Sequence, residues 1–164
     1  MKRLILAASA LLAVAAASSA LADSVNGASA TGTAGVTIFA PITVTQTQGL
    51  DFGAITSGAS GTVSIDQTSG SRKVSGGVGA IAVNVGKAGA FAVNGQSNAA
   101  INVVVGANIT GFSGGITGTT LASGLPTVLA GTSSTFNVGG SLNVPANTPA
   151  GAYTGSYTVA VNYP

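Results

Sequence analysis

The closing segment of the chain, residues 151–164, constrains the fold more than any other stretch. Its odd positions carry all three tyrosines of the protein together with two valines, and its even positions carry small or polar residues. Successive side chains of a β-strand point to opposite faces, so this alternation predicts one strand with a dry face and a wet face. Such a strand needs a partner in a sheet, because an open apolar edge recruits other chains.

The same alternation recurs along the chain and predicts an all-β fold. No sustained apolar spacing of about 3.6 residues follows residue 22, and clusters of Gly, Ser and Asn separate the alternating runs. Short strands divided by turn residues are typical of a β-sandwich or a small barrel, and we favour a sandwich of about seven to nine strands. The strongest candidate strands are residues 36–44, 50–55, 62–66, 81–85, 91–93, 101–105, 136–144 and 153–163. Residues 110–135 are too irregular for strands to be placed.

The first residues of the chain predict a secretory signal peptide. Lys2 and Arg3 precede an uncharged apolar run, and Ala20-Leu21-Ala22 fits a cleavage site. The apolar run, residues 4–17, is shorter than the roughly 20 residues that a membrane-spanning helix needs. We therefore expect residues 1–22 to be removed on export and the mature chain to have no membrane span.

Charge and composition exclude several classes of function. The mature chain is formally neutral, because its three cations balance its three acids: Arg72, Lys73, Lys87, Asp23, Asp51 and Asp66. Without a basic cluster we expect no nucleic-acid partner. The chain has no His, Cys or Glu, so we expect no enzyme, no metal site and no cofactor. Near-zero net charge also favours association between copies.

Two features leave alternatives open. Arg72 and Lys73 form either a solvated turn pair or a small contact patch. The tyrosine-bearing face is either a carbohydrate-stacking stripe or ordinary packing, and packing is favoured because large aromatic side chains prefer burial.

Near the other end, a second alternating stretch begins before the first strong strand. From Ala28 to Val44 the even positions are apolar or small, and most odd positions are polar. A strand of that length would far exceed the usual length of about 20 Å. Pro41 lacks an N–H group and is a natural boundary. We therefore divide the mature chain into an N-terminal arm, residues 23–40, and a single domain, residues 41–164.

Four segments resemble a known family. Residues 40–44, 50–55, 138–144 and 150–163 look like the bacterial exported proteins called DUF4402, which are similar in turn to the spore-coat-U and Csu-type pilins of the chaperone-usher system. Such pilins carry an aromatic residue next to last and a glycine fourteenth from the end. Tyr163 and Gly151 occupy those positions here. Two departures are the absence of cysteine for a disulfide and the small residues of the arm before Val36.

The resemblance implies an immunoglobulin-like sandwich that lacks its final strand. In that class a periplasmic chaperone lends a strand, an outer-membrane usher guides assembly, and the arm of the next subunit then replaces the lent strand by β-augmentation. The implied route runs through the periplasm to the cell surface.

We therefore expect a structural subunit of a pilus-like fibre whose partners are copies of itself or related subunits. The candidate donor face comprises Ala28, Ala30, Gly32, Ala34, Val36, Ile38 and Ala40. The candidate acceptor strand comprises Gly151, Tyr153, Tyr157, Val159, Val161 and Tyr163. The alternatives are a self-complete secreted domain that binds glycans or another surface, and a passive coat component without strand exchange.

Overall fold

The computed structural model describes residues 27–56 and 58–164. Residues 37–164 form one compact unit. Residues 27–36 lie outside it, and each of these ten residues is exposed and outside any strand. The expected signal peptide lies outside the described residues. The described part of the chain is all-β, so it offers no helix long and apolar enough to cross a bilayer.

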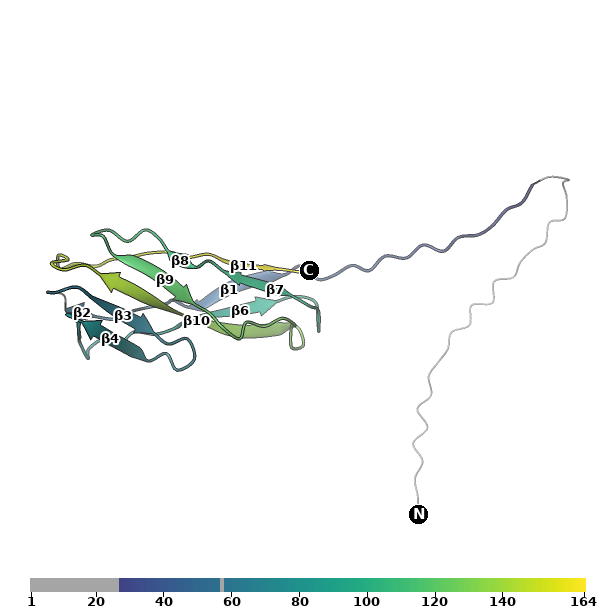
Figure 1. Cartoon of the computed structure of the whole chain (residues 1–164). Helices are drawn as coiled ribbons and strands as arrows, with labels where there is room; N and C mark the ends of the chain where they lie inside the picture. Colours follow the sequence, from purple (N-terminus) through teal and green to yellow (C-terminus); the bar gives the residue numbers. More distant parts are fainter. Residues whose placement is uncertain (1–26, 57) are drawn as a thin grey trace, which may run out of the picture. The chain divides into compact units, whose positions relative to one another are not determined.

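The compact unit is an antiparallel β-structure (Figure 1). Its described residues form eleven strands, three of which are two residues long. In chain order the strands are β1 (Thr43–Gln48), β2 (Ile55–Thr56), β3 (Gly61–Ile65), β4 (Arg72–Gly76), β5 (Gly79–Ala80), β6 (Gly89–Asn94), β7 (Asn102–Val105), β8 (Asn108–Ile109), β9 (Thr117–Leu121), β10 (Ser133–Val144) and β11 (Val159–Asn162).

Strand β10 links the two parts of the main sheet. Its first half pairs with β6, which pairs in turn with β1. Its second half pairs with β3 on one edge, followed by β4, and with β9 on the other, followed by β8. Strand β10 changes from β6 to β3 at Gly139, where the Ile65 carbonyl oxygen comes so close that an added Cβ would clash with it.

The C-terminal segment runs beside β7 and the residues after it. Strand β11 pairs with β7, and an isolated bridge joins Ser156 to Thr110. From residue 153 to residue 163 the odd side chains except Gly155 are buried or half-buried and the even ones are exposed, as the sequence predicts. The strand itself is shorter than predicted, because its ladder with β7 and the following residues is interrupted before Val159 and its other edge has no partner among the described residues.

The core lies between the curled layers in two clusters of apolar side chains. The first centres on Val93, Leu129 and Val138, and the second on Val63 and Val144, all of which are at most 2% exposed. No polar or charged residue is buried among the described residues. Burial of alternating strand residues thus stabilises a domain that has no cysteine for a disulfide.

Three predicted strands need correction. Residues 81–85 are a loop, and Val83 is 94% exposed. Within residues 50–55 only Ile55 belongs to a strand, and within residues 36–44 the strand begins at Thr43. The 81–85 loop makes only two backbone hydrogen bonds with the 50–55 segment, both to Ala54, and the carbonyl groups of Ile81 and Asn84 accept hydrogen bonds from the Arg72 side chain. The region that could not be placed, residues 110–135, contains β9 and the start of β10.

Candidate functional site

An open edge separates β1 from β11. Strand β1 pairs only with β6, and β11 pairs only with β7. The two strands lie close together, yet no backbone pairing joins them within residues 37–56 and 58–164. Every residue of β1 is exposed, including Val44 on the even face that the sequence predicts to be dry. Each strand therefore presents an unpaired ladder edge to the gap (Figure 1).

In the C-terminal segment, every second residue directs its backbone N–H and C=O groups toward this gap. Ser156 exchanges two hydrogen bonds with Thr110 at 2.7 and 2.8 Å, and the Thr158 carbonyl accepts one from the Gly106 N–H at 2.8 Å. Alternate residues of an extended chain direct their backbone groups to opposite edges. The N–H and C=O groups of the odd-numbered residues from 155 to 159 consequently point toward β1.

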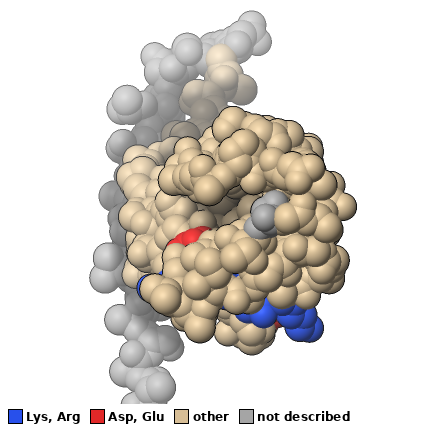
Figure 2. All heavy atoms as spheres, turned by 90° about the vertical axis from the view of Figure 1, so that its left-hand side faces the viewer, with Lys and Arg blue, Asp and Glu red and all other residues tan. Residues whose placement is uncertain are grey.

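Three adjoining cavities follow the gap and form one groove. Their volumes are about 400, 470 and 360 Å³. The first two share Leu50 and Tyr157, and the last two share Ile55 and Tyr153. Viewed from the end of the domain, the surface is visibly hollowed (Figure 2). We refer to the combined depression as the groove.

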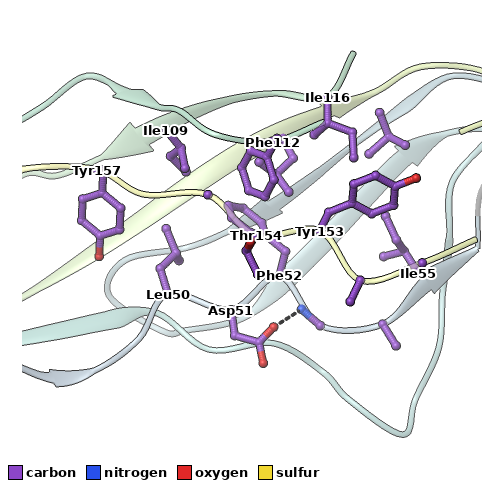
Figure 3. Close-up of a pocket in the computed structure, with 17 residues that line it drawn as sticks. Leu50, Asp51, Phe52, Ile55, Ile109, Phe112, Ile116, Tyr153, Thr154 and Tyr157 are labelled. Atoms are coloured by element: carbon purple, nitrogen blue, oxygen red, sulfur yellow. Dashed lines mark hydrogen bonds between the residues drawn. The ribbon is translucent and has the colours of Figure 1, made fainter. Parts of the chain in front are cut away.

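The groove is lined mainly by apolar side chains (Figure 3). One rim is the segment 50–55, which contributes Leu50, Phe52 and Ile55, and the other rim is the segment 151–157. The floor comes from five further apolar residues, Ile109, Phe112, Ile116, Leu142 and Val144. An apolar groove that continues from the gap between two unpaired strand edges, those of β1 and β11, is suited to an extended polypeptide.

The acidic residue that lines the groove, Asp51, is hydrogen-bonded within the rim. The Asp51 carboxylate accepts hydrogen bonds from the Gly53 N–H at 2.7 Å, drawn as a dashed line in Figure 3, and from the Asn84 side-chain amide at 3.1 Å. Asp66 lies elsewhere and caps a turn, where hydrogen bonds from Ser69 and Thr68 lower the pKa of its carboxyl group. The described residues hold no group of three His, Cys, Asp or Glu that could bind a metal ion.

The structure brings four of the six predicted acceptor residues to the groove. Gly151, Tyr153, Tyr157 and Val159 line it. Val161 is instead buried in the core at 9% exposure. The sequence predicts the opposite rim only as a candidate strand, because the alternation of Leu50 and Phe52 does not show that these side chains face a groove. The floor residues 109–116 fall mostly where the sequence allowed no placement.

The remaining predicted acceptor residue, Tyr163, contacts the last residues of the arm, Phe39 and Ala40. Its hydroxyl accepts a hydrogen bond from the Gln96 N–H at 2.7 Å and donates one to the Ala40 carbonyl at 2.8 Å. Its ring meets Phe39 edge to face at 5.3 Å. Ala40, which the sequence assigns to the donor face, is thus tied to its own domain. Ile38, two residues earlier, is 85% exposed.

Tyr157 has an unusual environment in the wall of the groove. Its hydroxyl is buried without a hydrogen-bond partner, and its ring packs on Phe91 with ring centres 6.1 Å apart. Burial raises the pKa of the phenol, and the Gln46 amide opposes part of that shift without reaching good hydrogen-bonding geometry. Folding therefore favours the neutral form of this tyrosine.

We expect Tyr157→Phe to be at least as stable as the natural chain at neutral pH, because a buried hydroxyl without a partner costs about 1–3 kcal/mol. The pKa of the Tyr157 phenol is higher in the folded chain than the value of about 10 in the unfolded chain. The resulting contribution to the free energy of unfolding is fully present below about pH 10 and is lost as the pH rises through the folded-state pKa. The variant should lose less stability in alkaline solution. Urea unfolding at neutral and alkaline pH measures both effects.

The matched control is Tyr153→Phe, because the Tyr153 hydroxyl donates a hydrogen bond to the Pro149 carbonyl at 2.7 Å. This variant should be less stable than the natural chain at neutral pH. A Tyr157→Phe chain that is less stable at neutral pH, with an unchanged alkaline loss, would contradict the assigned environment.

The described residues thus form an all-β domain with an apolar groove beside two unpaired strand edges, and they contain no group of three His, Cys, Asp or Glu that could bind a metal ion. The family model for DUF4402, a domain of unknown function, matches residues 42–163. The chain therefore belongs to the DUF4402 family. No curated protein and no solved structure matches the chain.

Proposed function

We propose that this protein is the structural subunit of a cell-surface fibre in which the groove of one copy receives the arm of the next copy as a β-strand. The observation that carries the proposal is the pair of unpaired strand edges of β1 and β11, together with the apolar groove that continues from the gap between them. A strand inserted there would gain main-chain hydrogen bonds from both edges, and its alternate side chains would reach the floor.

The arm has the pattern that such a groove requires. Its even positions are apolar or small and its odd positions are mostly polar, and Val36 and Ile38 are its largest even side chains. Both are 85% exposed. Exposed large apolar side chains that alternate with polar ones favour a segment that pairs with another surface.

The chemistry around Pro41 supports donation between copies rather than within one. A tight hairpin between the arm and β1 would need residues with positive φ at its turn, which Ala40 and Pro41 do not readily supply. The Ala40 N–H donates to the Gln96 side chain at 3.3 Å, and its carbonyl accepts from Tyr163. With both backbone groups of Ala40 engaged, folding back would break existing hydrogen bonds.

Donation between copies leads to a fibre for reasons of symmetry. The arm and the groove are different surfaces, so each copy that donates its arm leaves its own groove free for another copy. Head-to-tail contacts of this kind generate open filaments unless the rotation closes a ring. By the family resemblance, a periplasmic chaperone and an outer-membrane usher are the assembly partners that we propose for the exported chain.

Assembly of the purified mature chain tests this function. Electrophoresis without heating should show a ladder of species at whole multiples of the chain mass, and removal of residues 23–38 should leave monomers. A natural chain that stays monomeric at high concentration, with its groove closed to any added strand, would favour a self-complete secreted domain instead.

A further inference from the structure

Arg72 lies behind one rim of the groove and does not behave as a solvated turn residue. Strand β4 places it opposite Ile65 of β3, and from there its side chain reaches the loops that follow β1 and β5. The guanidinium donates hydrogen bonds to four backbone carbonyl groups, those of Phe52 at 3.4 Å, Ala54 at 2.9 Å, Asn84 at 2.7 Å and Ile81 at 2.8 Å. Two of these carbonyls belong to the rim and two to the 81–85 loop.

The geometry of this contact depends on a planar, multidentate cation. Four carbonyl oxygens converge on one guanidinium, which presents five N–H donors in a fixed fork. Without the cation the partial negative charges of these oxygens would repel one another. A lysine ammonium keeps the charge but has only three donors and no rigid plane, so it satisfies fewer of the carbonyls.

The local backbone is arranged to admit the guanidinium. Gly53 has a φ of 74°, and an added Cβ would clash with both the Arg72 side chain and the Asn84 carbonyl. Asp51 does not compete for the cation, because its carboxylate is bound to Gly53 and Asn84. Residues 52–54 of the rim lie outside the strands, and they are held by the two backbone hydrogen bonds of Ala54, with Asn84 and Ile81, and by the two contacts of Arg72 with the Phe52 and Ala54 carbonyls.

The position of this rim determines the shape of the groove. Leu50 and Phe52 project from it across Gly140 of β10, where an added Cβ would lie 3.1 and 3.0 Å from them. A rim that moved outward would carry these side chains away from the floor and change the spacing between the two ladder edges.

We propose that Arg72 is a positioning residue for strand binding: it fixes the 50–55 rim at the separation from the C-terminal segment that an inserted β-strand requires. This inference rests on the proposed function, since the strand is the arm of another copy. Arg72 acts through the rim backbone and does not itself line the groove.

The test uses the full mature chain with Val36→Asp and Ile38→Asp in its own arm, so that its groove stays free. A fluorescent synthetic peptide of residues 27–40 is the probe. In this background we compare Arg72→Gln and Arg72→Lys with two controls: Lys73→Gln, the exposed neighbour on β4, and Ile101→Val, which removes core volume away from the groove.

Peptide affinity should fall roughly tenfold or more in Arg72→Gln, fall less in Arg72→Lys, and stay within about twofold of the parent in both controls. Amide hydrogen exchange supplies a local readout. The Ala54 N–H donates a hydrogen bond to the Asn84 carbonyl, and the Ile81 N–H donates one to the Ala54 carbonyl. Both N–H groups should exchange faster in the Arg72 variants and at the parent rate in the two controls.

Unchanged affinity together with unchanged exchange at Ala54 in a folded Arg72→Gln chain would overturn the inference. An equal loss of affinity in Ile101→Val would also overturn it, because the effect would then follow stability alone. If the parent chain binds no peptide, the proposed function fails instead, and the exchange rates at Ala54 and Ile81 still decide whether Arg72 positions the rim. If Arg72→Gln does not fold, Arg72→Lys carries the same comparison.

Discussion

A chain carrying Val36→Asp or Ile38→Asp should remain monomeric where the natural chain assembles. In the proposed fibre both side chains face the apolar floor of the groove, and no basic residue lines that groove to pair with a carboxylate. Burying an unpaired carboxylate costs several kcal/mol, and each 1.4 kcal/mol lowers an association constant tenfold. We expect a loss of at least about a hundredfold in assembly, measured by light scattering and by unheated electrophoresis.

The matched control lies between these positions. Thr37→Asp adds the same charge to the same segment, but period-two geometry directs residue 37 to the opposite face of the inserted strand. It should assemble nearly as well as the natural chain. If Val36→Asp and Thr37→Asp reduced assembly equally, the added charge or a change in arm flexibility would be the cause, and the proposed donor face would be wrong.

A peptide of residues 27–40 should strongly raise the melting temperature of a chain whose own arm carries both aspartates. The open groove leaves two ladder edges unpaired, so the free domain is less stable than a strand-filled one. A ligand present at roughly a thousand times its Kd stabilises the folded state by about 4 kcal/mol. For a domain of this size that corresponds to a rise of about 10 °C or more, measured by calorimetry.

Two comparisons make this result specific. The same peptide with Val36→Asp and Ile38→Asp should give no rise, and the peptide with Thr37→Asp should give most of it. An acceptor chain that melts at the same temperature with and without the natural peptide would mean that the groove is complete by itself.

The sequence predicted the faces of the C-terminal segment more accurately than its hydrogen bonds. Alternation at Tyr153, Tyr157 and Val161 reports which side chains are buried, and burial is what the structure confirms. Strand bounds depend on partners that alternation does not reveal. The segment before Val159 is extended without a continuous ladder because its neighbour is interrupted and its other edge is open.

The second wall of the groove could not be predicted from local pattern. Leu50 and Phe52 alternate like strand residues, but the carbonyls of the 50–55 segment bind the Arg72 side chain across a long sequence separation. The same side chain binds two carbonyls of residues 81–85, where apolar alternation at Val83 and Val85 leads to exposed loop residues. Both segments that were predicted as strands, 50–55 and 81–85, thus have backbone carbonyls bound to the side chain of one residue, Arg72.

Cysteine cross-linking tests the donation of the arm between copies most directly, because the natural chain contains no cysteine that would react in the background. One copy carries Ile38→Cys in its arm, and another carries Thr154→Cys at the rim of its groove. The copies are unfolded, mixed, refolded and treated with a short thiol-reactive cross-linker. If the arm of one copy enters the groove of the other, a covalent dimer of the two different copies forms. A mixture that yields no dimer, while a single chain carrying both cysteines cross-links internally, would contradict donation of the arm between copies.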